Sequence, residues 1–233
     1  MEWKDTTVII PTLNERDNIK KLLSFLLSLY PEIKIIVTDD GSEDGTQDIV
    51  REIGKKNANI QLLDRSNEKT HGLTVSVLDG IENVRTEYFI VMDGDLQHPP
   101  EKVGDLIQKL REGKDIVVGV RECVAVEWLW YRKLMSKIAM KLGILFLRLR
   151  GKKSCKDVLS GFFGARTSFL IPLIHSSSNS FVLEGYKILY DILKILPEDT
   201  EIGEVGYTFG TRKGGKSKIG LKQIFSFCFS LLK

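Results

Sequence analysis

The first 120 residues alternate between short apolar runs and longer amphipathic segments, and this rhythm restricts the chain to few folds. The apolar runs are rich in β-branched residues, which is typical of buried strands. We expect strands at residues 6–10, 33–38, 60–63, 88–92 and 115–120. Apolar residues at helical spacing predict helices at residues 15–29, 44–56, 73–84 and about 101–112. Strands that alternate with helices predict an α/β fold, with a mainly parallel sheet covered by helices on both faces.

Local signals suggest where some of these elements begin and end. Pro11 follows the first apolar run and is expected to end that strand, because proline has no amide hydrogen. Thr12 and Glu15 have the spacing of a capping box, in which two side chains bind free amides at a helix start. Pro99 and Pro100 suit the first turn of the fourth helix.

Polar residues follow three of the predicted strands. They occupy residues 11–15, 39–42 and 93–97. The carboxyl ends of parallel strands meet at one edge of a sheet, and ligands bind at that edge. The sequence therefore predicts a single binding site built from three separate loops.

The segment Asp93-Gly94-Asp95-Leu96-Gln97 is the strongest chemical signal in the chain. On an extended chain, side chains two residues apart point the same way, so Asp93, Asp95 and Gln97 should converge. Such oxygen ligands suit Mg²⁺ or Mn²⁺, and the cation would neutralise a diphosphate leaving group. Gly94 would let a ligand approach the backbone. The alternative is a polar turn after a buried strand.

The other two polar clusters are less specific. Asp39 is a candidate acceptor for hydrogen bonds from a nucleobase, but Asp and Ser around a glycine are also common in turns. Glu15 fits a nucleotide ligand and a helix cap equally well.

The composition excludes several functional classes. A length of 233 residues with 42% hydrophobic content suits one folded domain, and a net charge of +3 is too small to indicate nucleic acid binding. Three widely separated cysteines form no zinc or CxxC spacing, which favours reduced thiols in a cytosolic protein. No signal peptide is evident, and no apolar run reaches the roughly 18 residues that a transmembrane helix needs.

Two segments combine apolar and basic residues with no acidic residue at all. They are residues 128–153 and 211–233. A cationic face opposite Leu and Phe favours peripheral binding to an anionic membrane surface, here at its cytoplasmic face, although core helices with solvated lysines have the same composition. We expect a main domain over residues 1–218 and an amphipathic basic tail over residues 219–233.

As an ordered set, these sequence features resemble the family 2 glycosyltransferases, and among them the dolichyl-phosphate mannosyltransferase type. The resemblance extends from Val8 to about Phe229. Each motif alone is a common string, and their order makes the set specific. The motifs are Val8-Ile9-Ile10-Pro11-Thr12-x-Asn14-Glu15, Val37-x-Asp39-Asp40-Gly41-Ser42, Met92-Asp93-x-Asp95-Leu96-Gln97-His98-Pro99-Pro100, Gly119-x-Arg121, Tyr131-Arg132-Lys133-x-x-Ser136-Lys137, Ser160-Gly161-Phe162-Phe163 and Phe209-Gly210-x-Arg212.

The resemblance implies a GT-A fold and an inverting, metal-dependent transfer of a hexose, with GDP-mannose as donor and dolichyl or polyprenyl phosphate as acceptor. It implies that Mg²⁺ or Mn²⁺ is held by Asp93, Asp95 and Gln97, and that the catalytic residues are Asp95, Arg121 and Arg132. The acceptor phosphate would contact Arg132, Ser136 and Lys137. The sugar nucleotide would contact Pro11, Thr12, Glu15, Val37, Asp39, His71, Asp93, Gly94, Asp95, Arg121, Arg212 and Lys218. Further partners are a membrane surface and, as one option, a separate membrane-anchoring subunit.

The chain departs from the family pattern before its third helix. Thr70-His71-Gly72 stands where the family often has a lysine followed by glycine, and a neutral imidazole attracts phosphate less than a lysine does. This departure leaves the nucleotide open. The main alternative is therefore transfer from a UDP-sugar to a polyprenyl phosphate.

Three further alternatives remain. Residues 210–217 match the Walker A pattern, but the 16 residues after Ser217 cannot supply the strands and acid of a P-loop enzyme, so we interpret this segment as a loop closing over donor phosphates. A catalytically inactive module that binds sugar nucleotides would have no need of Asp93, Asp95 and Gln97. Transfer to a sugar hydroxyl would need a general base, and none is evident.

Overall fold

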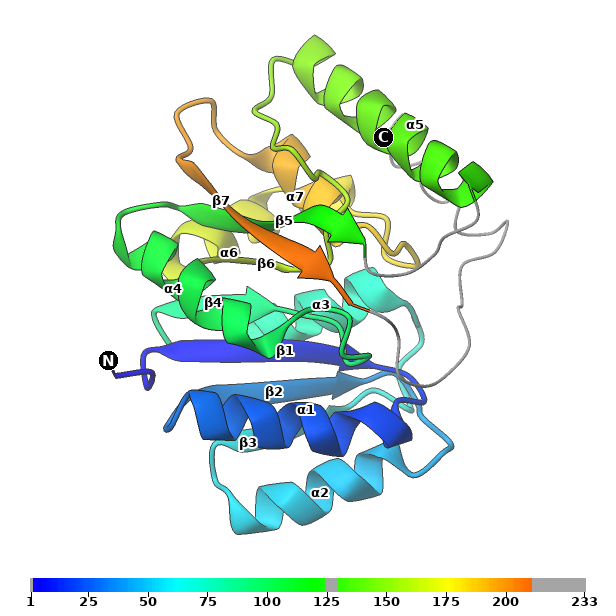
Figure 1. Cartoon of the computed structure of the whole chain (residues 1–233), viewed down its shortest axis with the longest axis vertical. Coiled ribbons are helices and arrows are strands. Elements are labelled where there is room, and N and C mark those ends of the chain that lie inside the picture. Colours follow the sequence, from blue (N-terminus) through cyan, green and yellow to red (C-terminus); the bar gives the residue numbers. More distant parts are fainter. Residues whose placement is uncertain (1, 125–129, 211–233) are drawn as a thin grey trace.

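A computed structural model describes residues 2–124 and 130–210, with the backbone alone for residues 124 and 130–134. Each strand and helix expected in the first 120 residues is present, with ends that differ by a few residues (Figure 1). The elements are β1 (Thr6–Thr12), α1 (Arg16–Leu29), β2 (Lys34–Asp39), α2 (Thr46–Lys56), β3 (Ile60–Asp64), α3 (Leu73–Glu82), β4 (Tyr88–Val91), the 3₁₀ turn η1 (Pro100–Lys102), α4 (Val103–Arg111), β5 (Ile116–Val124), α5 (Trp130–Leu149), β6 (Phe163–Arg166), α6 (Thr167–Ser176), the 3₁₀ turn η2 (Ser178–Ser180), α7 (Ile188–Ile195) and β7 (Ile202–Phe209).

The strands form one seven-stranded sheet in the order β3-β2-β1-β4-β6-β5-β7. β1, β2, β3 and β4 pair in parallel, and so do β5 and β7. β6 is antiparallel to both of its neighbours, β4 and β5. The prediction of a mainly parallel sheet is confirmed. The carboxyl ends of β1, β2, β4, β5 and β7 consequently lie at the same edge.

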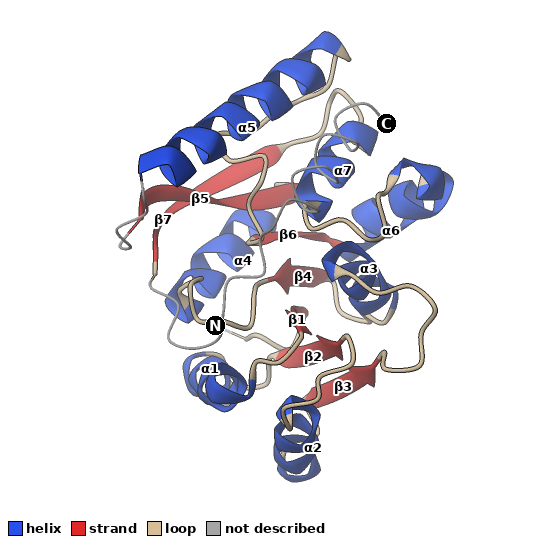
Figure 2. Ribbon diagram, turned by 90° about the vertical axis from the view of Figure 1, so that its right-hand side faces the viewer, coloured by secondary structure: helices blue, strands red, loops and turns tan. Residues whose placement is uncertain are grey.

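Helices cover both faces of the sheet, as predicted (Figure 2). One face packs against α1, α2 and α4, whose buried side chains include Leu22, Val50 and Leu106. The other face packs against α3, α6 and α7, where Val77 and Leu170 are buried. The apolar residues that predicted these helices from their spacing therefore form two separate hydrophobic layers, one on each side of the strands.

β1 does not end at Pro11 as predicted, but continues to Thr12. The carbonyl of Ile9 accepts a hydrogen bond from Met92 just after β4, whereas the carbonyl of Thr12 accepts one from Asp40 just after β2. Groups of alternate residues face the same side of a strand, so Pro11 faces the β4 side, beyond the last paired residue of β4. No partner there requires the missing amide, which explains why the strand tolerates proline.

The predicted capping box at the start of α1 is wrong. The Glu15 carboxylate accepts a hydrogen bond from the Asn18 side chain at 2.9 Å. Asp44, in the loop before α2, instead accepts a hydrogen bond from the amide of Arg16 at 3.0 Å. The amino end of α1 is therefore satisfied by a residue distant in the sequence, and spacing within the helix gives no sign of it.

Gly164 in β6 lies so close to β4 that no larger residue fits. A β-carbon at Gly164 would lie 2.3 Å from Cδ1 of Ile90 and 2.5 Å from the carbonyl oxygen of Phe89. We expect Gly164→Ala to lower the free energy of unfolding by about 1–3 kcal/mol, measured by urea denaturation, because backbone must move. At Gly203 in β7 the two nearest atoms are side-chain atoms of lysines. Equal losses in Gly164→Ala and Gly203→Ala would contradict this steric explanation.

Candidate active site

The loops after β1, β2 and β4 meet, which confirms the predicted gathering of polar residues at one edge. The hydroxyl of Thr12 at the end of β1 donates to Asp39 at the end of β2, at 2.8 Å. A β-carbon at Gly94 would lie 3.2 Å from Cγ2 of Thr12 and 3.6 Å from Cγ of Glu15. The loop after β4 is thus packed directly against the loop after β1, and Gly94 serves this packing.

Asp39 is fully buried, and both of its oxygens already accept hydrogen bonds within the protein. Oδ1 accepts from the Ser42 amide and the Gln47 side chain, each at 2.8 Å. Oδ2 accepts from the Thr12 hydroxyl at 2.8 Å and the Ser42 hydroxyl at 2.6 Å. A nucleobase would have to displace one of these donors, so in this structure Asp39 holds the ends of β1 and β2 together.

Two other residues that were predicted to contact the sugar nucleotide are also buried. The side chain of Val37 lies inside the hydrophobic core, which excludes a nucleotide contact through that side chain. Pro11 is likewise buried within β1. These two residues belong to the strands that carry the site. From the sequence alone, a residue that only supports the site cannot be distinguished from one that contacts the nucleotide.

Asp40 fixes the loop that contains His71. The Asp40 carboxylate accepts hydrogen bonds from the buried Arg65 guanidinium and from the Gly72 amide, the latter at 2.8 Å. The His71 ring lies 3.1 Å from the same carboxylate through Nδ1 and is half-exposed. Arg65 also pairs with Asp79 at 2.6 Å. His71 is therefore held beside the end of β2, and its predicted role toward donor phosphates stays a prediction.

The segment from Asp93 to Gln97 is a turn and not the extended chain on which the metal argument rested. β4 ends at Val91, and Leu96 has a positive φ of 63°. Alternation along a strand therefore does not explain how Asp93 and Asp95 are placed. Asp93 remains 35% exposed in its side chain, whereas Asp95 is buried.

Hydrogen bonds attach this turn to the end of β7. Asp95 accepts a hydrogen bond from the Gln97 amide at 3.1 Å. The Gln97 side chain donates to the carbonyl of Gly210 at 3.1 Å, and the Gly210 amide donates back to the Gln97 carbonyl at 2.9 Å. The predicted metal ligands are thus connected to the strand that leads into residues 211–233.

His98 holds the same turn in place through a hydrogen bond and an aromatic contact. Its Nδ1 accepts a hydrogen bond from the Asp93 amide at 3.0 Å, and its ring stacks on Phe162 with centroids 5.1 Å apart. Burial lowers the pKa of His98 to about 4, so the ring is neutral at pH 7. Because Nδ1 is the acceptor, the ring proton resides on Nε2. The sequence contained His98 in a motif but gave it no role.

This buried histidine predicts a pH dependence of stability. The unfolded chain binds a proton at His98 near pH 6.5 whereas the folded chain does so near pH 4, so stability should fall by up to about 3 kcal/mol as the pH decreases between these values. Urea unfolding from pH 4 to pH 7, in EDTA to exclude bound metal, measures this slope. His98→Gln retains an acceptor but does not titrate, and we expect a shallower slope. Equal slopes in the two proteins would contradict the assignment.

Arg121 and Asp157 form a buried ion pair next to the turn. Arg121 in β5 donates from Nε at 2.7 Å and from Nη2 at 2.8 Å to the two oxygens of Asp157, whose side chain is 3% exposed. Burial opposes both charges, but the hydrogen bonds and attraction between the two side chains lower the pKa of Asp157 and raise that of Arg121. The Asp93 charge also acts on Arg121. Arg121 is therefore within electrostatic range of Asp93, one of the predicted metal ligands.

Asp157 was missed by sequence reasoning. The signal that could have revealed it is a single acid between the basic segment and the Ser160-Gly161-Phe162-Phe163 motif. That motif both lines the candidate site and packs into the core. A β-carbon at Gly161 would lie 3.0 Å from an Asp93 oxygen, whereas Phe162 is fully buried.

A family model described as Glycosyl transferase family 2 matches residues 7–172. The chain belongs to this family. Its relatives include the dolichol-phosphate mannosyltransferases of Pyrococcus furiosus, 36% identical over 95% of this chain, and of Saccharomyces cerevisiae, 33% identical over 95%. The chain spans 61% of the length of the Pyrococcus relative and 83% of that of the Saccharomyces one. The polyprenol monophosphomannose synthase of Mycolicibacterium smegmatis is 28% identical over 97% of this chain and 85% of its own length.

Solved structures show the same fold for this family 2 glycosyltransferase. Glucosyl-3-phosphoglycerate synthase from Mycobacterium tuberculosis, in complex with Mn²⁺, UDP and glucosyl-3-phosphoglycerate, superposes with a TM-score of 0.65. It is 21% identical and covers 97% of this chain and 77% of its own. The prediction of a GT-A fold is confirmed by this likeness, which at such an identity concerns the fold alone.

The residues predicted to bind the acceptor phosphate take no part in the contacts described above. Ser136 and Lys137 belong to α5, where Ser136 is half-buried and Lys137 exposed. Arg132 is in the same helix, but its side chain is outside the described part, as are Arg212, Lys218 and the expected tail over residues 219–233. The roles of these residues stay predictions.

The protein ligands available to a metal are few. Within residues 2–124 and 130–210, no group of three or more His, Cys, Asp or Glu side chains is arranged to hold a metal ion. As predicted ligands, Asp93 and Asp95 would supply two carboxylates and Gln97 one amide oxygen. Such a set fits Mg²⁺ or Mn²⁺ that completes its coordination with substrate phosphates, because these cations are usually held by one or two carboxylates and phosphate oxygens.

Proposed function

We propose that this chain transfers mannose, with inversion, from GDP-mannose to dolichyl or another polyprenyl phosphate. The observation that carries the proposal is the placement of the Asp93–Asp95 turn next to the Arg121–Asp157 pair at the carboxyl edge of the sheet. Carboxylates for a cation and a guanidinium for a phosphate thus lie together. The names of the relatives support the sugar and the class of acceptor.

The cation in this proposal is Mg²⁺ or Mn²⁺, held by Asp93, Asp95 and Gln97. When bound, it neutralises charge on the diphosphate that leaves the sugar. The Mn²⁺ in the mycobacterial glucosyl-3-phosphoglycerate synthase complex is consistent with a divalent metal on this fold.

Arg121 is oriented by Asp157 to bind a phosphate. Two of its five N–H groups donate to Asp157. No described residue accepts a hydrogen bond from Nη1, so Nη1 and the second N–H of Nη2 can make the planar, two-point contact that arginine makes with phosphate oxygens. The acceptor phosphate needs no general base, because its second pKa of about 6 leaves it largely ionised at neutral pH. The protein's task is therefore to position two anions and stabilise charge.

The exposed face of α5 supports a peripheral position on a membrane surface, which we place at the cytoplasmic face in this proposal. Its exposed apolar side chains follow one another at steps of three and four residues: Met135, Ile138, Leu142, Leu145 and Leu149. Lysines and arginines flank them, with no acid in the helix. Figure 1 shows this helix along one end of the molecule. None of the described helices has the length and apolar character to cross a bilayer.

Vesicle sedimentation tests this membrane contact. Leu142→Glu with Leu145→Glu should abolish binding to vesicles that contain anionic lipid, while Leu183→Glu, an exposed leucine outside α5, should not. Unchanged binding by the α5 variant would reject α5 as the contact, whereas failure of the wild type to bind would leave a separate anchoring subunit as the alternative.

The transfer itself is tested with a panel of GDP- and UDP-sugars, dolichyl phosphate and either Mg²⁺, Mn²⁺ or EDTA. We expect labelled mannosyl lipid from GDP-mannose only with a divalent cation. Faster transfer from UDP-glucose would favour the second candidate, a glucosyltransferase acting on the same acceptor, which the UDP-glucose complexes of the fold relative also suggest. Nucleotide binding without transfer from any donor would indicate an inactive binding module.

A further inference from the structure

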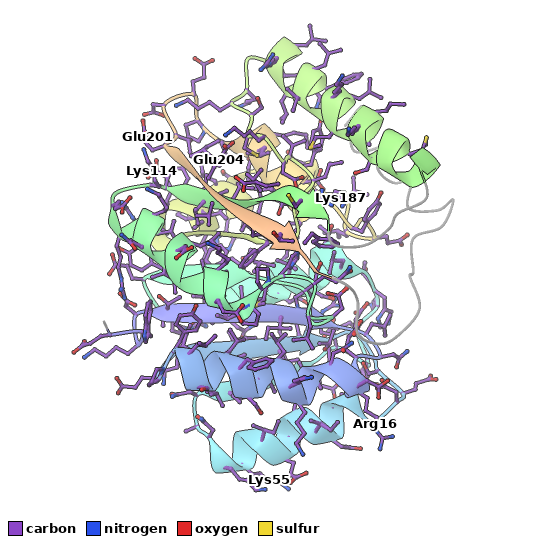
Figure 3. The ribbon with its side chains drawn as sticks, viewed as in Figure 1. Arg16, Lys55, Lys114, Lys187, Glu201 and Glu204 are labelled. Carbon is purple, nitrogen blue, oxygen red and sulfur yellow. The ribbon has the colours of Figure 1, made fainter. Side chains whose placement is uncertain are left out.

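Lys187 places an unassigned cation at the active site. It immediately precedes α7, and its Nζ donates to the carbonyl of Leu159 at 3.0 Å. Leu159 lies two residues before Gly161, whose Cα is covered by the Asp93 carboxylate. In the view of Figure 3 Lys187 is labelled near the carboxyl end of β5, and the charge of Arg121 in that strand acts on it. Nothing in the sequence set Lys187 apart from the other lysines.

Few negative charges near Lys187 are available to balance it. Within residues 2–124 and 130–210, the charges that act on it are those of Arg121, Asp93 and Asp157. Asp157 already makes a two-point ion pair with Arg121. Burial, and then the charge of Arg121, lower the pKa of Lys187 to about 8 despite the two carboxylates. If Asp93 binds a divalent cation, even less negative charge remains for Lys187.

The backbone that carries Lys187 is firmly held. The buried Asp191 accepts a hydrogen bond from the Val182 amide at 3.1 Å, and Lys194 donates to the Ser180 carbonyl at 3.1 Å. The carbonyls of Leu183 and Gly185 accept hydrogen bonds from the first turn of α3. The side chain therefore extends from a fixed position, which reduces the entropy lost when it binds an anion.

We propose that Lys187 is a phosphate-binding residue that acts beside Arg121 on a phosphate group of a bound substrate. The phosphate belongs either to the donor diphosphate or to the lipid acceptor, and both would bring the negative charge that the cluster of Arg121, Lys187 and the metal lacks. The inference rests on the proposed function only in assuming that the substrates carry phosphate. An ammonium and a guanidinium on one phosphate would hold it by charge-assisted hydrogen bonds.

The test measures binding separately from catalysis. We would determine dissociation constants by calorimetry for GDP and UDP with Mn²⁺ and for a short-chain polyprenyl phosphate, in the wild type, Lys187→Met, Lys187→Arg and the exposed control Lys56→Met. Lys187→Met should weaken one of these ligands by about 10- to 100-fold, Lys187→Arg should restore much of the loss, and Lys56→Met should change nothing. The ligand that weakens identifies which phosphate Lys187 meets.

A purely structural lysine gives a different result. If Lys187→Met lowers the melting temperature but leaves every dissociation constant within about twofold of the wild type, the proposal is overturned. If that variant does not fold, Lys187→Gln, which can still donate to Leu159, makes the same comparison. Absence of sugar transfer by the wild type would refute the proposed function, whereas the binding measurements would still decide the role of Lys187.

Discussion

Asp93→Asn and Asp95→Asn should each reduce kcat/KM for sugar transfer by at least about 100-fold. Each change removes one of the two negative charges that would hold the divalent cation, while the amide keeps the size of the side chain. In Asp95→Asn, the remaining side-chain oxygen can still accept the hydrogen bond from the Gln97 amide, so the turn should persist. Initial rates of labelled lipid formation, measured across a Mn²⁺ titration, check this prediction.

The metal titration separates loss of the site from loss of the fold. A weakened metal site should raise the Mn²⁺ concentration needed for half-maximal rate, with an unchanged melting temperature in EDTA. Asp48→Asn, at an exposed acid on α2, is the matched control and should behave as the wild type. Normal turnover by either active-site variant would show that the carboxylates after β4 do not hold an essential cation.

Arg121→Met should lose both activity and stability, because it leaves Asp157 buried without its partner. Removing one member of a buried ion pair typically costs about 3–5 kcal/mol. The double variant Arg121→Met with Asp157→Asn removes both charges and should recover much of the stability but none of the activity. Urea unfolding and initial rates on the three proteins check both expectations. Recovery of transfer in the double variant would exclude Arg121 as a phosphate ligand.

The Arg121–Asp157 pair should also make the stability of the protein depend on pH in a defined direction. Because the pKa of Asp157 is lowered in the folded chain, the stability that the pair contributes is present above the unfolded pKa of about 4 and is lost as the pH falls below it. In Arg121→Met the unpaired Asp157 can be protonated in mild acid. The stability difference between the wild type and Arg121→Met should therefore shrink from pH 7 to pH 4.

The sheet and the meeting of three polar loops at one edge could be predicted because both depend on local patterns. Apolar periodicity depends on neighbours within one element, and the parallel arrangement then brings the ends of β1, β2 and β4 to one edge without any further information. The choice of Asp93 and Asp95 as candidates needed only their position after a buried strand.

The residues that the sequence analysis assigned wrongly or missed have partners far away along the chain. Thr12 has the spacing of a helix cap, but its hydroxyl bonds to Asp39 instead. Asp157 and Lys187 come from segments that have no periodic signature pointing to the site. Local spacing carries no information about such pairings, since they are decided only when the sheet is assembled.

The position of the antiparallel strand β6 leads us to expect that the candidate site assembles late in folding. β6 separates β4 from β5, so the parallel block β1 to β4 can pair its strands early, whereas β5 and β7 join it only through a strand from much later in the sequence. Asp93 follows β4 in the first block, and Arg121 lies in β5 of the second. We therefore expect Asp93 and Arg121 to come together only after β6 has joined the two blocks, so a chain in which one block alone has formed should lack one of these two groups.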